Sequence, residues 1–481
     1  MKISHIIFDN EAHLSQKEKD IEFKNIVTNA KDIGENSLLI IPNSKKAIFD
    51  NSKVPVAVIC DHNCNPPQGF TTIRVNNPRL IMAFAYFRFY NINTQKFKLI
   101  GITGTNGKSS TAMLIRNILS GCGQKVGFIG TGRIEIDGKV ISDPYYSMTT
   151  PDPELLYKSI KEMEDTGCNT IVMEVSSHAL SLDKVAPLHF DYGVFTNFES
   201  DHLDFHQNID NYFTAKAKLF AISKCGVFNI DDNNVKTAYD MCNTRKISVS
   251  TMSSANARAF NVINRGLSGI EYIYRSGAYK LLISLSLAGY NNVYNSLLAI
   301  SVCIDIKCNP YDVQRILSDT KALVGRYEII KDKISVIIDY AHTASAFEAL
   351  LKELYFNKEN KKLTVVFGCG GNRDRTKRPI MAALAERYAD KIIITSDNSR
   401  NENPQEIIMD IVKGLKENKH RIIENRAEAI RAAILFSNDD DIVAIIGKGP
   451  ERYNIDVNGY SIFNENEIVS NALQERRSIL Q

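Results

Sequence analysis

The strongest constraint on the fold of this chain is the stretch Gly104-Thr105-Asn106-Gly107-Lys108-Ser109-Ser110. Residues 97–102 before it are mostly apolar, as in a buried strand, and residues 111–119 after it carry apolar side chains at helical spacing. A glycine-rich turn between a strand and a helix points backbone N–H groups and the positive end of the helix dipole at one place, which suits a polyphosphate. The stretch therefore predicts a nucleotide site, although a purely structural glycine turn is the alternative.

Two side chains of this loop have expected roles toward such a ligand. Lys108 would reach the terminal phosphates, and the hydroxyl of Ser109 or Ser110 would bind Mg²⁺. The standard phosphate-loop pattern has a glycine where this chain has Ile102, so the spacing is not the usual one.

Length and charge limit the class of protein. The chain has 481 residues, which is too long for one hydrophobic core, so we expect several domains. A net charge of +3 favours neither nucleic acid nor an anionic membrane as a partner, and no apolar run reaches transmembrane length. The nine cysteines are scattered, which is typical of a reducing cytoplasm, and the pair Cys60 and Cys64 is more typical of a loop than of half a metal site.

Strand-like and helix-like segments alternate along the chain, which predicts an α/β protein with mostly parallel sheets. We expect three domains: a small α/β domain at 1–96, a central phosphate-loop ATPase-like domain at 97–326 and a Rossmann-like domain at 327–481. The expected strands are 37–42 and 54–60 in the first domain, 97–102, 126–129, 170–175 and 192–196 in the second, and 336–339, 364–367, 391–395 and 442–446 in the third.

Polar clusters follow several strands of the central domain, where parallel sheets bind their ligands. Glu174 directly follows a strand and could bind Mg²⁺ or cap the next helix. Residues 199–206 contain three carboxylates and two histidines, typical either of a metal-linked site or of a solvated acidic turn. Asn292 and Asn295 lie one helical turn apart and could hold a base or ribose, or only pack.

Four strands of the third domain end in charged or glycine-rich loops, at 339–342, 368–375, 396–400 and 447–451. Because the ends of parallel strands meet at one edge, we expect these loops to form one pocket. Two of the loops carry arginines, Arg373 and Arg400, which suit bidentate binding of carboxylates.

Taken in order, these motifs resemble those of the Mur ligase family, in particular its tripeptide-forming members. The matching segments are TGTNGKSS, TTPDP, MEVSSHAL, FTNFESDHLDFH, YFTAKAKLF, DYAHT, GCGGNRDRTKRP, SDNSRNENP, NRAEAI and GKGPE, across roughly residues 97–465. The resemblance implies three domains that bind the UDP end of the substrate, ATP and the incoming amino acid, respectively.

The resemblance also implies the reaction, an ADP-forming amide ligation in peptidoglycan precursor synthesis with ATP and Mg²⁺. ATP would phosphorylate the D-glutamyl carboxylate of UDP-N-acetylmuramoyl-L-alanyl-D-glutamate, and the amine of a diamino acid would attack the acyl phosphate. Only small molecules are then expected as partners, and the enzyme is expected to be a cytoplasmic monomer. The alternatives are a paralogous Mur-type or folylpolyglutamate-type ligase with another acyl substrate, or a non-catalytic nucleotide-binding protein.

The resemblance implies a role for each matching residue. The catalytic residues would be Lys108, Lys216 and His202, and the metal ligands would be Ser109, Glu174, His202 and Lys216; the family carbamylates the lysine that matches Lys216. ATP would be contacted by residues 104–110, Asn292, Asn295, Arg326 and Asp339. The UDP substrate would be contacted by Thr149, Thr150, Ser176 and Lys184, and the amino acid by Arg373, Asp397, Asn398, Arg400, Gly447 and Glu451. Without the resemblance, Lys216 and Lys218 would be interpreted as surface charges of an amphipathic helix.

The loop at 397–400 bears on the choice of amino acid. Family members that add meso-diaminopimelate carry Asp-Asn-Pro-Arg, and here Asp397-Asn398-Ser399-Arg400 keeps the arginine and loses the proline. Since Arg400 could pair with the second carboxylate of diaminopimelate, we expect this amino acid rather than lysine. The chain departs from the family motifs at Thr28-Asn29-Ala30-Lys31, Lys184, Ala344-Ser345 and Pro450. Several of these changes fall on the UDP-substrate side, so a paralogue with another acyl substrate and amino acid remains an alternative.

Overall fold

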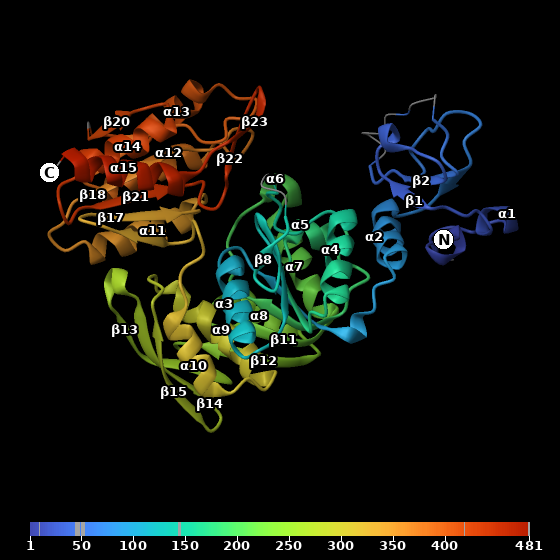
Figure 1. The fold of residues 1–481 in the computed structure, drawn as a ribbon, viewed down its shortest axis with the longest axis horizontal. Coiled ribbons are helices and arrows are strands. Elements are labelled where there is room, and N and C mark those ends of the chain that lie inside the picture. The colour runs from blue at the N-terminus through green and yellow to red at the C-terminus, as the bar shows by residue number, and fades with distance from the viewer. Residues whose placement is uncertain (9, 44–48, 50–52, 143–145, 418, 480–481) are drawn as a thin grey trace.

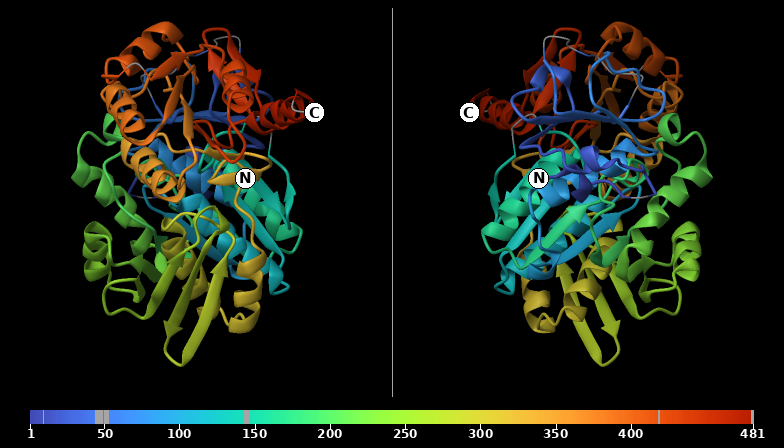
Figure 2. Two further views of the ribbon diagram at one scale, coloured as in Figure 1. Left: turned by 90° about the vertical axis from the view of Figure 1, so that its left-hand side faces the viewer. Right: turned by 90° about the vertical axis from the view of Figure 1, so that its right-hand side faces the viewer.

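The computed structural model describes residues 1–481 except 9, 44–48, 50–52, 143–145, 418 and 480–481. Within the described residues the chain forms three main sheets, which follow one another along the sequence. Figure 1 shows the N-terminal sheet and the C-terminal sheet on opposite sides of the central part of the molecule, and Figure 2 shows the same arrangement from the two sides.

The N-terminal sheet is parallel and has the order β1-β2-β3-β4. Its strands are β1 (Asn25–Val27), β2 (Ser37–Ile40), β3 (Ala57–Cys60) and β4 (Thr72–Arg74). The expected strands at 37–42 and 54–60 are confirmed but shorter. Helix α2 (Pro78–Phe89) then leads to the central sheet and packs against α4 (Pro153–Asp165). Cys60 and Cys64 lie buried in a small apolar cluster, which agrees with a loop between them.

The central sheet has a parallel middle of order β12-β11-β10-β5-β9-β6. These strands are β5 (Lys98–Thr103), β6 (Val126–Gly130), β9 (Thr170–Glu174), β10 (Phe190–Phe195), β11 (Ser223–Asn229) and β12 (Arg245–Ser250). The expected strands near 97–102, 126–129, 170–175 and 192–196 are therefore confirmed. At one edge, β7 (Arg133–Ile136) and β8 (Lys139–Val140) continue the sheet in antiparallel fashion. At the other edge, β13 (Ala257–Asn264) pairs in parallel with β12, and β14 (Ile270–Ser276) and β15 (Tyr279–Leu285) then add antiparallel strands.

Helices cover both faces of this sheet, as expected. They are α3 (Lys108–Gly121), α4, α5 (Ser177–Ser181), α6 (Leu203–His206), α7 (Ile209–Ala221), α8 (Asn233–Met241), α9 (Asn291–Asp305) and α10 (Pro310–Asp319). Alternate side chains of β5 enter different cores: Leu99 packs with α4 and α7, whereas Ile100 and Ile102 pack with α3 and α9. This sandwich holds the start of α3 at the carboxyl edge of the sheet.

The C-terminal sheet has the order β16-β17-β21-β18-β19-β20 and is parallel except for β16. Its strands are β16 (Glu328–Lys331), β17 (Ser335–Asp339), β18 (Leu363–Phe367), β19 (Lys391–Ile394), β20 (His420–Ile422) and β21 (Ile442–Ile446). The expected strands at 336–339, 364–367, 391–395 and 442–446 are confirmed. Since β17, β21, β18 and β19 are parallel neighbours, the polar loops that follow them meet at one edge, as expected.

Helices also cover both faces of the C-terminal sheet. α11 (Ala344–Asn357), α12 (Lys377–Tyr388) and α13 (Pro404–Val412) pack on one face, and α14 (Arg426–Leu435) and α15 (Glu465–Ile479) pack on the other. A hairpin of β22 (Tyr453–Asp456) and β23 (Gly459–Ile462) follows β21.

Among the described residues, no helix combines the length and the apolar character that crossing a bilayer requires.

Candidate active site

The glycine-rich loop adopts the expected strand–loop–helix geometry, since β5 ends at Thr103 and α3 begins at Lys108. Gly104 and Gly107 have φ angles of +147° and +80°, in the region that favours glycine. A Cβ atom on Gly104 would lie 1.9 Å from Thr196 Oγ1, and one on Gly107 would lie 2.5 Å from Asn295 Oδ1. Both positions therefore require glycine, and the loop leaves the first N–H groups of α3 directed at the space in front of it.

Two lysine amines meet at one carbonyl of this loop. Lys108 Nζ donates to Gly104 O at 2.9 Å and to Thr105 O at 2.8 Å, and Lys216 Nζ, from α7, donates to Gly104 O at 2.7 Å. Burial lowers the pKa of Lys108, and burial together with the charge of Lys108 lowers the pKa of Lys216 well below its ordinary value. Lys216 is thus a buried amine and not the surface charge that its sequence context suggested by default, whereas Lys218 is exposed.

Oxygen ligands gather beside the first turn of α3. Ser109 Oγ donates to Glu174 Oε2 at 2.9 Å, and the backbone N–H of Thr131 donates to Glu174 Oε1 at 2.9 Å. Glu174 does not cap the following helix, because Ser176 is the N-cap of α5 and accepts from Ala179 N. The helix-cap interpretation of Glu174 is therefore wrong, and its carboxylate lies at the phosphate loop.

The segment 199–206 faces both the loop and the C-terminal sheet. Glu199 Oε2 accepts from Asn106 Nδ2 at 3.0 Å and from Ser345 Oγ at 2.5 Å, so this segment is not simply a solvated turn. His202 has a φ of +53°, and partial burial lowers its pKa to about 4, which keeps its ring neutral at neutral pH. A neutral imidazole is the form that binds metals.

The described residues contain no cluster of three His, Cys, Asp or Glu side chains arranged for a metal ion. Of the residues expected to bind the metal, the structure brings together the hydroxyl of Ser109 and the carboxylate of Glu174, whereas His202 lines the larger cavity described below. A hydroxyl and a carboxylate are hard oxygen donors, so the pair Ser109 and Glu174 fits Mg²⁺ beside a nucleotide polyphosphate.

A cavity of ≈ 390 Å³ extends from the phosphate loop to α11. Its wall carries the four residues expected to contact the nucleotide outside the loop: Asn292, Asn295, Arg326 and Asp339. Asn295 Nδ2 donates to Asn292 Oδ1 at 3.0 Å, and Arg326 Nη2 donates to Ser109 Oγ at 3.3 Å. The guanidinium of Arg326 also lies 4.3 Å from the centre of the Tyr340 ring, which holds this cation near the loop.

A larger cavity of ≈ 1140 Å³ lies between the central and C-terminal sheets. The central side contributes Glu199 to Asp204, and the C-terminal side contributes the residues expected to bind the amino acid: Arg373, Asp397, Asn398, Arg400, Gly447 and Glu451. Arg400 has a φ of +52°, and its Nη1 donates to Gly371 O at 2.9 Å and to Asn398 O at 3.3 Å. The two arginine-bearing loops therefore face the His202 segment across one cavity.

Sequence reasoning missed Lys448, which organises the floor of this larger cavity. Its fully buried Nζ donates to Asn398 Oδ1 at 2.8 Å and lies 3.8 Å from both Asp397 Oδ1 and Glu451 Oε2. Burial raises the pKa of Glu451, with a further contribution from Asp397, whereas the charge of Lys448 holds the pKa of Asp397 below its usual range. A lysine between two glycines directly after a buried strand was the available signal.

The residues expected to contact the UDP substrate have different partners in the structure. Thr150 Oγ1 donates to Glu174 O at 2.9 Å and to Ser176 Oγ at 3.3 Å, and the Thr149 and Thr131 hydroxyls lie 3.0 Å apart, so these residues surround Glu174. Lys184 instead forms an ion pair of 2.7 Å with Asp152, which precedes α4. Since Asp152 lies two residues after Thr150, this ion pair joins Lys184 to the segment that carries the two threonines.

A buried arginine supports the loop that carries Arg373. Arg378 is fully buried, and its guanidinium pairs with Glu402 and with Asp410, each at 3.0 Å. Glu402 in turn accepts from the backbone N–H of Asn372 at 2.5 Å. This network connects the loop after β18 to α13.

We expect Arg378→Met to reduce the free energy of unfolding by about 1.5–3 kcal/mol, because it removes the buried cation that joins Glu402 and Asp410, which then keep only Arg375 and Lys413 as charged partners. Urea unfolding followed by circular dichroism measures this change. The control is Arg387→Met on the same helix, where the side chain is exposed and lies 3.9 Å from Glu348. Equal stabilities of the two variants would contradict a supporting role for Arg378.

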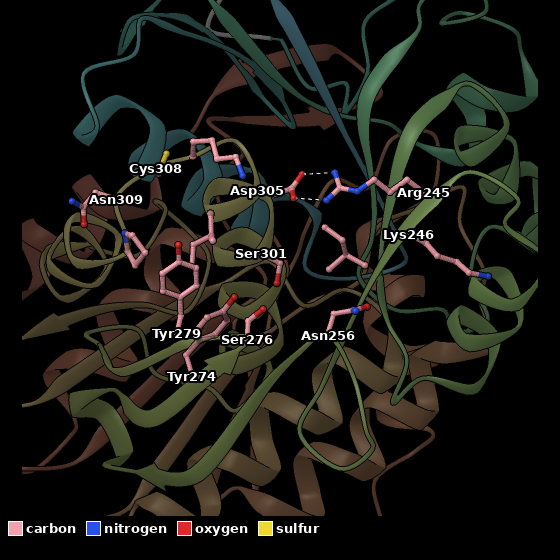
Figure 3. Close-up of a pocket in the computed structure, with 14 residues that line it drawn as sticks. Arg245, Lys246, Asn256, Tyr274, Ser276, Tyr279, Ser301, Asp305, Cys308 and Asn309 are labelled. Carbon is pink, nitrogen blue, oxygen red and sulfur yellow. Dashed lines mark hydrogen bonds and ion pairs between the residues drawn. The ribbon is translucent and has the colours of Figure 1, made fainter.

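A separate cavity of ≈ 670 Å³ lies at the opposite edge of the central sheet (Figure 3). Arg245, at the amino end of β12, forms a two-pronged ion pair with Asp305, which also accepts from Tyr192 OH at 2.5 Å. Because the strands here are parallel, this end lies across the sheet from the phosphate loop, and the cavity is distinct from the two described above.

Two family models match the chain in order. The model described as "Mur ligase middle domain" matches residues 102–303, and the model described as "Mur ligase, glutamate ligase domain" matches residues 325–449. The UDP-N-acetylmuramoyl-L-alanyl-D-glutamate–2,6-diaminopimelate ligase 1 of Clostridium acetobutylicum is 35% identical over 489 residues, which cover 99% of this chain and 100% of that protein. The corresponding ligase of Caldanaerobacter subterraneus is 38% identical over 425 residues, or 87% of each chain.

Solved structures share the fold. A UDP-N-acetylmuramoyl-L-alanyl-D-glutamate–2,6-diaminopimelate ligase superposes with a TM-score of 0.67 at 24% identity, covering 99% of each chain. A folylpolyglutamate synthase from Mycobacterium tuberculosis superposes with a TM-score of 0.64 at 18% identity, covering 77% of this chain and 93% of that one. These likenesses extend over the sheets that hold the two cavities.

Proposed function

Because this chain belongs to the Mur ligase family, we propose that it is an ATP-dependent, ADP-forming ligase that adds meso-diaminopimelate to UDP-N-acetylmuramoyl-L-alanyl-D-glutamate in peptidoglycan precursor synthesis. The observation that carries this proposal is the larger cavity, where the segment beside the phosphate loop faces the loops of Arg373 and Arg400. Relatives whose names state this reaction align over nearly the whole chain.

Activation of the D-glutamyl carboxylate requires positive charge, because an anion must attack the γ-phosphate of ATP. Lys108, the N-terminus of α3 and Arg326 supply that charge in one place. Ser109, Glu174 and His202 would hold Mg²⁺, together with Lys216 once its amine is carbamylated. The ion would supply further charge neutralisation on the phosphates.

The proposed reaction has two steps, a phosphoryl transfer and an acyl transfer. A carboxylate oxygen of the D-glutamyl group bonds to the γ-phosphorus, and the bond from that phosphorus to the bridging oxygen breaks to release ADP. The nitrogen of the incoming amine next bonds to the acyl carbon, the bond from that carbon to the phosphate oxygen breaks to release inorganic phosphate, and the proton lost by the amine passes to the departing phosphate or to water. The wall formed by Arg373, Asp397, Asn398 and Arg400 would orient the amine toward the carboxylate held near Lys108.

Each part of the chain has a role in this proposal. Residues 1–96 would bind the UDP end, residues 97–326 ATP, and residues 327–481 the amino acid. We place the enzyme in the cytoplasm as a monomer that acts on small molecules. Free thiols on all described cysteines support the cytoplasmic location, and a net charge of +3 supports small molecules rather than nucleic acid as partners.

Arg400 is the residue expected to select diaminopimelate. We expect Arg400→Lys to raise KM for meso-diaminopimelate about tenfold to a hundredfold and to leave any weak activity with L-lysine unchanged, because a hydrogen-bonded charge pair contributes about 1.5–3 kcal/mol. Steady-state phosphate release with each amino acid measures this difference. The control is Arg375→Lys in the neighbouring loop, since Arg375 pairs with Glu402. A proportional loss with both amino acids would contradict a selective role.

The proposed reaction is tested by ATP hydrolysis that depends on both the UDP-muramoyl dipeptide and meso-diaminopimelate. The expected result is stoichiometric formation of ADP, phosphate and the tripeptide product, identified by mass spectrometry. If no diamino acid supports turnover although ADP binds, this result would favour a paralogous ligase with another acyl substrate. The departures from the family motif at Thr28-Asn29-Ala30-Lys31 would then be the first positions to test for altered substrate binding.

A further inference from the structure

The inner end of the nucleotide cavity carries an acidic side chain that the proposed mechanism does not use. Glu353 lies on α11, and its Oε2 accepts from the backbone N–H of Tyr290 at 3.2 Å, at the start of α9. Its other oxygen, Oε1, is buried and has no hydrogen-bond partner among the described residues, and the same holds for the hydroxyl of Tyr327. Both residues line the cavity whose outer end is formed by Gly107 and Ser110 of the phosphate loop.

The shape of this inner end suits a flat ring. Gly289 has a φ of +100°, and a Cβ atom there would lie 3.5 Å from Glu353 Oε2 and 3.6 Å from Asn292 Nδ2. Because Gly289 carries no side chain, the space between Glu353 and Asn292 stays open, and Ala349 and Leu350 of α11 add apolar wall to the same cavity. A planar base needs such a slot, with polar groups only at its edges.

We propose that Glu353 is a specificity residue that recognises the base of the bound nucleotide by accepting a hydrogen bond from the 6-amino group of adenine. This inference rests on the proposed nucleotide site. The 6-amino group has two N–H donors, and ring nitrogen N7 beside it is an acceptor. The amide of Asn292 can accept one proton and donate to N7, and the carboxylate of Glu353 accepts the second proton.

The electrostatic setting of Glu353 supports this role. Burial raises the pKa of Glu353, and the backbone N–H groups of Tyr290 and Gly289, at the positive end of α9, oppose that rise. A buried carboxylate oxygen without a partner is costly, so a donor on the ligand would satisfy an existing requirement. A base without a 6-amino group would leave the oxygen unpaired.

A purely structural role is the competing explanation, because the bond to Tyr290 links the C-terminal part of the chain to the start of α9. The experiment separates the two by comparing ligands as well as variants. Isothermal titration calorimetry gives Kd for ADP and for purine riboside 5′-diphosphate, which lacks the 6-amino group, with wild type, Glu353→Ala and Glu353→Gln. The matched control is Glu348→Gln on the same helix, whose side chain accepts from Tyr388 OH at 3.4 Å.

The expected result is that wild type prefers ADP and that Glu353→Ala and Glu353→Gln each lower this preference about tenfold, while Glu348→Gln keeps it. Glu353→Gln retains an oxygen for Tyr290, so it reports on the base even if Glu353→Ala unfolds. An equal loss of affinity for both ligands, or no loss, overturns the inference and leaves the nucleotide site intact. Failure of wild type to bind ADP overturns the proposed function itself.

Discussion

Replacing Lys108 by Met is expected to lower kcat/KM for ATP-dependent ligation by about a hundredfold to a thousandfold, the usual effect of removing one preorganised group that stabilises charge in a transition state. Lys108 is half-buried within the phosphate loop, and its Nζ donates to Gly104 O and Thr105 O. A bound γ-phosphate would offer it a stronger, charged acceptor, so its contribution should grow during phosphoryl transfer.

Phosphate release in the presence of both substrates measures this loss, and ADP affinity shows whether binding also suffers. The control is Lys98→Met, an exposed lysine at the other end of the strand that leads to the loop. A folded Lys108→Met enzyme with near-normal turnover would contradict the assignment of the loop as the phosphate site.

Replacing Lys216 by Met is expected to have two effects of opposite sign: activity falls at least about a hundredfold, and stability in carbon-dioxide-free buffer rises by about 1–4 kcal/mol. Activity falls because Met cannot form a carbamate. Stability rises because the amine is fully buried with a pKa well below its ordinary value, while Gly104 O keeps Lys108 as a donor.

The pH dependence of this gain follows from the direction of the shift. The unfolded lysine titrates near pH 10.4 and the folded one much lower, so folding releases a proton at pH values between the two. The cost of burying the amine is full below the folded pKa and disappears as the pH rises through the unfolded pKa. The stability advantage of Lys216→Met should therefore be larger at pH 7 than at pH 10.5.

Urea unfolding at both pH values checks this prediction, with Lys218→Met as the control because Lys218 is an exposed lysine on the same helix. Carbon-13 NMR in labelled bicarbonate should show a carbamate signal in wild type and none in Lys216→Met. A stability difference that does not vary with pH, together with an unchanged carbamate signal, would contradict both parts of the prediction.

Several parts of the fold followed from local pattern. The apolar runs around residues 100, 172 and 444 lie buried on both faces, and such runs are typical of parallel strands between helices. The strands β13, β14 and β15, which extend one edge of the central sheet, were not expected. Their residues alternate between buried and partly exposed over a stretch with many polar side chains, so the apolar signal is weak.

For the candidate site, too, some residues could be predicted from local sequence pattern and others could not. The glycine-rich loop could be located from the sequence because Gly104 and Gly107 are required by their backbone angles, a local property. The burial of Lys216 and the position of Lys448 could not, because each depends on groups that lie far away in the chain. A lysine in an amphipathic helix looks the same whether its face meets solvent or a phosphate loop.

The sequence by itself determined four parallel strands in each of the two larger sheets, the position of the phosphate loop and the loops that end the C-terminal strands, because periodicity and glycine geometry act over a few residues. The tertiary structure alone decided which side chains share a cavity. Glu353 approaches Gly289 and Asn292, and Arg400 faces the His202 segment, only because two separately formed sheets pack with their carboxyl edges toward one another. Contacts of that kind depend on the packing of whole layers, and no local pattern records them.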